Sequence, residues 1–140
     1  MTTEPILQEL DEAMTDARIH FDESGYLGNC ANVAVALYDI ALEDFDDDRF
    51  RFVVIDRPFH WGHGPDHVAV EYNGKYLDSK GIHSRSELLD IVGNKEGNEA
   101  VMRVEDRKYI VTHNAHFEKQ ESERLKEKIR NNIETVNSEL

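Results

Sequence analysis

The 140-residue chain has little cysteine and little proline: one cysteine and three prolines. A single cysteine cannot form an internal disulfide, which is typical of a protein kept in a reducing compartment. No apolar run approaches the length of a membrane span, and the start, MTTEPILQEL, lacks the basic and apolar regions of a secretory signal. We therefore expect a cytoplasmic protein with one core, in which residues 1–117 form the body and residues 118–140 a helical extension.

Basic residues are also scarce, with 16 against 29 acidic residues and a net charge of −13. The excess lies in residues 1–117, which hold 11 basic and 23 acidic groups, whereas residues 118–140 are nearly balanced. A body this acidic repels nucleic-acid phosphate, so direct nucleic-acid binding is not expected. The charge favours a basic protein or peptide as substrate or partner, although it also serves solubility.

The periodicity of apolar residues predicts an α+β fold. Asn73-Gly74 is a strong signal for a two-residue hairpin, and Ser84 with Glu87 forms a capping box that begins a short helix ending near Gly93. The other expected helices are 4–18, 30–43 and 116–140, and the expected strands are 50–56, 67–72, 75–78, 100–105 and 107–113. The last two strands are expected to form a second hairpin.

The only cysteine, Cys30, stands at the front edge of a small-residue helix, in GNCANVAVAL. Asn29 is a good N-cap for this helix, which is apolar on several faces and is expected to be buried. Cysteine is often a small core residue, and Cys30 can be interpreted in that way. A helix N-terminus also stabilises a thiolate, so Cys30 is equally a candidate nucleophile.

The first hairpin places a histidine and a carboxylate near each other. Its two-residue turn, Asn73-Gly74, sets Ala69 opposite Asp78. His67 then lies on the same face as Asp78, with Cβ atoms about 7–8 Å apart or somewhat less. A cysteine mechanism needs a base and a third group that orients the base, and His67 and Asp78 fit these roles beside Cys30.

A glycine-x-cysteine that opens a small-residue helix, followed by a strand beginning HVAVE and then by YLD, resembles the transglutaminase-like and papain-like cysteine superfamily. The resemblance covers roughly residues 25–82. It implies a cysteine-bearing helix packed on an antiparallel β-sheet, with Cys30, His67 and Asp78 as the catalytic triad. The superfamily contains peptidases, deamidating enzymes, amide and acyl transferases and inactive relatives, so the resemblance implies a thioester intermediate without specifying what resolves it.

Two features depart from the pattern of that superfamily. No tryptophan follows the cysteine, and no glutamine precedes it at the papain-like oxyanion position. Ser24, Asn29 or backbone N–H groups near Cys30 would then have to stabilise the oxyanion. Trp61 is expected to form an aromatic wall of the site, and Tyr76 is a further candidate for substrate binding.

Two other functions remain open from the sequence. His60, His63 and His67 could bind zinc, with Cys30 as a fourth ligand, in a zinc-dependent hydrolase. No paired-cysteine or helical histidine signature accompanies them, so neither a metal nor another cofactor is expected. The acidic chain could alternatively be a non-catalytic binding or inhibitor protein on the same fold.

An apolar stripe runs along the C-terminal helix, formed by Leu125, Ile129, Ile133, Val136 and Leu140. Such a stripe must cover an apolar surface, either on the same chain or on a second copy in a homodimer. It spans only about two heptads, which is short for a coiled coil. We therefore expect the helix to pack at least partly on its own domain, with pairs between Glu123 and Lys126 and between Glu127 and Arg130.

Overall fold

A computed structural model of the chain describes residues 5–19, 29–56, 67–92, 101–113 and 117–138. The elements in these ranges are α1 (Pro5–Asp16), α3 (Asn29–Phe45), β1 (Arg51–Asp56), β2 (His67–Tyr72), β3 (Lys75–Asp78), β4 (Gly81–His83), α4 (Arg85–Val92), β5 (Val101–Glu105), α5 (Arg107–His113) and α6 (Lys119–Ser138). The predicted α+β class is confirmed. No helix within the described ranges is long and apolar enough to cross a membrane.

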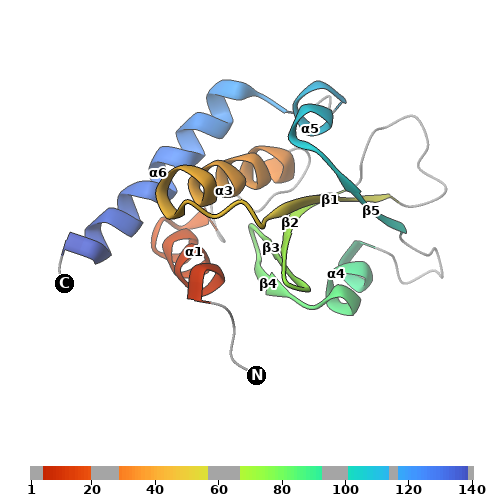
Figure 1. The fold of residues 1–140 in the computed structure, drawn as a ribbon, viewed down its shortest axis with the longest axis horizontal. Coiled ribbons are helices and arrows are strands. Elements are labelled where there is room, and N and C mark those ends of the chain that lie inside the picture. The colour runs from red at the N-terminus through yellow and green to blue at the C-terminus, as the bar shows by residue number, and fades with distance from the viewer. Residues whose placement is uncertain (1–4, 20–28, 57–66, 93–100, 114–116, 139–140) are drawn as a thin grey trace.

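The five described strands form one open antiparallel sheet in the order β4-β3-β2-β1-β5. Figure 1 shows α1, α3 and α6 gathered on one side of this sheet and α4 on the other. Because successive side chains of a strand point to opposite faces, apolar residues cover both faces of the sheet. Phe52, Val54, Val68 and Val70 face the large cluster under α3, whereas Val53, Ile55 and Ala69 face a small cluster under α4.

The local signals for the first hairpin and for α4 are confirmed. Asn73 and Gly74 form the turn with φ of 50° and 83°, and Tyr72 pairs with Lys75 as the two-residue loop requires. In the capping box, the Glu87 carboxylate accepts the Ser84 N–H at 2.7 Å, and Ser84 Oγ accepts the Glu87 N–H at 3.2 Å.

The buried helix α3 extends two residues beyond the predicted end, into the acidic segment. Asp46, with φ of 50°, terminates it in the left-handed conformation that usually favours glycine. The Asp47 N–H then donates to the Ala41 carbonyl at 2.9 Å, so the chain folds back on the end of the helix. The connection from α3 to β1 therefore begins at Asp46.

The predicted strand over 107–113 is wrong, and so is the second hairpin. This segment forms α5, because Asp106 Oδ1 accepts the Tyr109 N–H at 2.8 Å and caps the helix. Arg107 also forms two hydrogen bonds of 3.0 Å with the carboxylate of Asp39 in α3. With Ile110 fully buried in the large cluster, capping and packing outweigh the strand preference of this β-branched and aromatic segment.

The C-terminal helix α6 packs on its own domain, as predicted for its apolar stripe. Leu125 and Ile129 are fully buried, and Ile133 is 7% exposed, in the same cluster as residues of α1 and α3. The helix starts three residues later than predicted, where Asn32 Oδ1 accepts the Glu118 N–H at 2.9 Å. The side chains of Val136 and Leu140 lie outside the described residues.

Candidate active site

The predicted contact between the histidine and the carboxylate of the first hairpin is present. His67 Nε2 lies 2.8 Å from Asp78 Oδ2. His67 is the first residue of β2 and Asp78 is the last of β3, so the two side chains meet at one end of the sheet. Their side chains are 15% and 3% exposed. A carboxylate this deeply buried requires hydrogen-bond donors to remain charged.

The second oxygen of Asp78 has two donors that the sequence analysis did not identify. His83 Nε2 lies 2.9 Å from Oδ1, and the backbone N–H of Lys80 donates to the same oxygen at 2.8 Å. The connection from β3 to β4 has two residues and pairs Asp78 with Gly81, so His83 lies on the same face as Asp78. The alternation of side chains across this second turn predicts that His83 faces the same way as Asp78, but β4 itself was not predicted.

The electrostatics favour an ionised pair in this cluster. Burial alone would lower the pKa of His67, but hydrogen bonds to Asp78 and to Cys30 outweigh it and raise this pKa to about 9. Burial likewise opposes ionisation of Asp78, yet the bonds from His67 and His83 hold its pKa well below the usual range. The hydrogen bond to Asp78 also raises the pKa of His83.

The same histidine lies near the only cysteine. Cys30 lies in the first turn of α3, as predicted, and its thiol contributes to the raised pKa of His67. Since Nε2 of His67 is bonded to Asp78, Nδ1 is the ring nitrogen left to face the sulfur. Cys30 is 7% exposed and borders the large apolar cluster, so it has both the surroundings of a core residue and a polar partner.

The remaining predicted site residues fall in two groups. Ser24, Trp61, His60, His63 and the side chain of Asn29 lie outside the described residues. Tyr76 is described, and it is buried in the small cluster under α4, whereas Cys30 lies in the large cluster. The structure therefore does not place the Tyr76 ring with Cys30. Within the described ranges, no group of three histidine, cysteine or acidic side chains is arranged to hold a metal ion.

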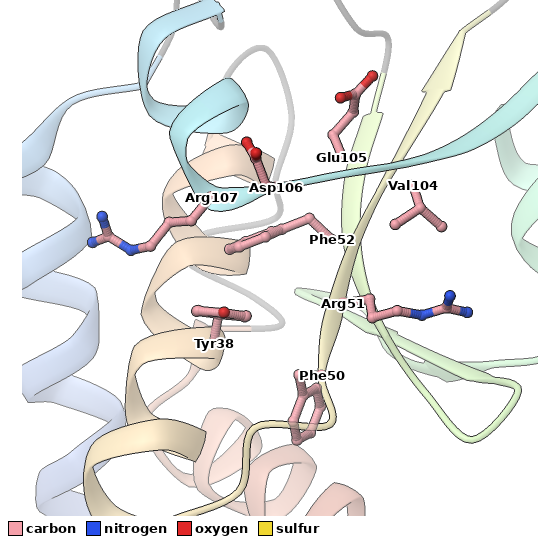
Figure 2. A pocket seen from close by; sticks show the side chains of 8 residues that line it. All are labelled: Tyr38, Phe50, Arg51, Phe52, Val104, Glu105, Asp106 and Arg107. Carbon is pink, nitrogen blue, oxygen red and sulfur yellow. The ribbon is translucent and has the colours of Figure 1, made fainter.

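A pocket of about 440 Å³ lies at the other end of β1, away from this cluster. Figure 2 shows its lining residues, which are Tyr38, Phe50, Arg51, Phe52, Val104, Glu105, Asp106 and Arg107. The Tyr38 and Phe52 rings stack with centroids 4.5 Å apart. The guanidinium groups of Arg51 and Arg107 point away from these rings in Figure 2 and are bonded to Glu71 and Asp39. The pocket therefore offers an apolar wall but no residue of the cysteine cluster.

Comparison of the chain with protein-family models, with curated proteins and with solved structures finds no match. The candidate site is therefore argued from its own geometry and chemistry.

Proposed function

We propose that the protein is a thiol-dependent enzyme that attacks an amide or a related acyl group, on a core of the papain-like or transglutaminase-like type. The observation that carries the proposal is that one imidazole, His67, bonds the buried carboxylate of Asp78 and lies near enough to the thiol of Cys30 for that thiol to raise its pKa. A nucleophile, a base in contact with it and a group that orients the base are the three parts of such a site.

The reaction would proceed in two steps. Nδ1 of His67 takes the thiol proton, and the Cys30 sulfur attacks the carbonyl carbon to form a tetrahedral intermediate. His67 then gives that proton to the leaving amine as the carbon–nitrogen bond breaks, which leaves a thioester on Cys30. Asp78 stays ionised and holds His67 through Nε2. Water or a second amine, deprotonated by His67, would then resolve the thioester by hydrolysis or transfer.

The start of α3 supplies a physical reason for placing the sulfur there. The first N–H groups of a helix have no partner inside the helix, and the helix dipole makes this end positive. Backbone N–H groups beside Cys30 are thus candidate donors to the oxyanion of the tetrahedral intermediate. A protein or peptide substrate that carries basic residues would suit the net charge of −13.

An activity-based probe tests the proposal directly, because the chain has a single cysteine. The folded protein is treated with a peptide that carries an acyl electrophile, and the intact mass is measured. We expect one added probe in the wild type, none in Cys30→Ala, and much slower labelling in His67→Ala. Labelling of the wild type only after unfolding would overturn the proposal.

A further inference from the structure

The cluster contains a second imidazole, which the reaction above does not use. His83, in β4, reaches the same carboxylate as His67 but the opposite oxygen. Its side chain is 12% exposed, against 15% for His67, so the two imidazoles are buried to a similar degree. Two imidazoles on one buried carboxylate exceed what a Cys-His-Asp site requires.

We infer that His83 is a positioning residue: by donating Nε2–H to Oδ1 of Asp78, it fixes the carboxylate so that Oδ2 receives Nε2–H of His67. The inference rests on the proposed function, since the orientation of His67 matters because of the thiol that it faces. The contact of 2.9 Å has the length of a charge-assisted hydrogen bond.

The geometry explains how hydrogen bonds to Oδ1 of Asp78 fix the position of its Oδ2. A carboxylate can rotate about its bond to Cβ, and rotation of Asp78 would move Oδ2 away from His67. The donors on Oδ1 oppose that rotation, and they are His83 Nε2 and the Lys80 N–H. The Lys80 N–H is a backbone donor and remains in any side-chain variant. A substitution at His83 therefore removes only one of the two donors to Oδ1.

Charge gives His83 a second effect on the same site. If the thiol and His67 form an ion pair, Asp78 leaves the group with a net charge of −1. A protonated His83 restores neutrality, which favours the thiolate in a buried cluster. Two further charged groups act on His83: Glu87 of α4, which is exposed and engaged in the capping box, raises its pKa, and the charge of His67 lowers it.

Two variants of similar side-chain length separate donation from packing. His83→Gln keeps an N–H donor near the position of Nε2, whereas His83→Met has none. The rate at which iodoacetamide alkylates Cys30 is measured at neutral pH, together with thermal unfolding of each variant. We expect His83→Met to be slower than wild type by roughly tenfold, the low end of the cost of losing a partner that orients a functional imidazole. His83→Gln should stay within about threefold, since it loses the charge but keeps a hydrogen bond.

Nitrogen NMR of the imidazoles, recorded above the raised pKa of His67 of about 9 so that the ring is neutral, gives a readout that a purely structural role would not change. In wild type, both His67 and His83 should carry a proton on Nε2, and in His83→Met the His67 ring should become a mixture of tautomers. Unchanged alkylation and an unchanged His67 tautomer in a folded His83→Met would overturn the inference. So would a wild-type His83 protonated on Nδ1 alone, a result that does not depend on whether His83→Met folds.

The tautomer of His67 is also measured in Cys30→Ala, with and without His83→Met. If the wild-type thiol proves unreactive, the proposed function fails, but the response of His67 to His83→Met still tests the positioning role. If the thiol is reactive and depends on His67 while His83→Met changes nothing, only the positioning role fails.

Discussion

The two ends of α3 carry polar contacts of opposite kinds. At its C-terminal end, Glu43 and Asp44 bond Arg130 of α6 at 2.8 Å, and the two acidic side chains are 51% and 28% exposed. At its N-terminal end, the thiol of Cys30 lies near His67, which in turn bonds a carboxylate that is 3% exposed. One end therefore keeps its charges in water, whereas the other buries them.

This difference between the two ends leads to different expectations for protein stability and for the reactivity of Cys30. Exposed ion pairs are worth about 0–1 kcal/mol each, so α6 is held mainly by the apolar residues beneath them. Buried charges carry a desolvation penalty that apolar side chains of the same size would avoid. We therefore expect the free energy of unfolding to depend mainly on the apolar residues that α6 buries and little on the exposed pairs at the C-terminal end of α3, whereas substitutions in the buried cluster should also change the reactivity of Cys30.

The largest effect is expected where α6 packs. Ile129→Asp with Ile133→Asp removes two buried apolar side chains and introduces two charges, which should cost about 5 kcal/mol or more. That is comparable to the whole stability of many domains, so the melting temperature should fall steeply or folding should be lost. Thermal and urea unfolding measure the change.

Two exposed positions of the same helix provide the control. Gln120→Asp with Asn131→Asp adds the same two charges without removing a buried apolar group. This variant should melt close to wild type. If the Ile129 and Ile133 variant also kept wild-type melting, α6 would not be packed as described.

The buried cluster should make stability depend on pH. The pKa of His67 is raised to about 9, so its contribution is complete below about pH 6.5 and is lost as the pH rises toward 9. The pKa of Asp78 is lowered, so its contribution is present above about pH 4 and is lost as the pH falls below that value. Stability should therefore be highest between about pH 4 and 6.5.

Urea unfolding at about pH 6 and about pH 9 measures this dependence. The loss between the two should reach up to about 3 kcal/mol in wild type and should shrink in Asp78→Asn, where the charged partner of His67 is absent. Equal losses in the two proteins would mean that this pair is not the source of the dependence.

The next effect concerns reactivity. His67→Ala and Asp78→Asn should each slow alkylation of Cys30 at neutral pH, by roughly 10- to 100-fold, the range expected from losing a general base or its positioning partner. The double variant should be little slower than the worse single one, because groups that share one task are not additive. Rates that simply multiply, or that do not change, would remove these residues from a common mechanism.

The smallest effect is expected at the exposed end of α3. Arg130 is 17% exposed and bonds Glu43, Asp44 and Glu127. Arg130→Met keeps its apolar stem but removes the charge, and should cost about 1 kcal/mol or less, with a smaller difference at high salt. A loss of several kcal/mol would show that the exposed pairs, rather than the apolar stripe, hold α6.

Local rules predicted the parts of the fold that depend on short-range geometry. The Asn73-Gly74 turn fixed the register of β2 and β3, and that register alone predicted the contact between His67 and Asp78. The capping box at Ser84 and the stripe of α6 were equally visible, because each is a spacing of residues within one element.

The errors came from interactions between elements. Segment 107–113 has strand-like residues, but its cap at Asp106 and the bond from Arg107 to Asp39 make it a helix. His83 escaped notice because β4 has only three residues, too few for periodicity to detect. The proximity of Cys30 to His67 could be expected only from the needs of a cysteine mechanism and from a resemblance, since no local pattern specifies how α3 packs on the sheet.

The central claim is that Cys30 is a nucleophile held by His67 rather than a core residue, and its alkylation rate tests this most directly. Iodoacetamide alkylation is followed by mass spectrometry at neutral pH, in the folded protein and in the same protein unfolded in urea. We predict that the folded protein reacts faster than the unfolded chain despite the 7% exposure of Cys30, and that His67→Ala abolishes this advantage. A thiol that reacts only once the chain is unfolded would contradict the account.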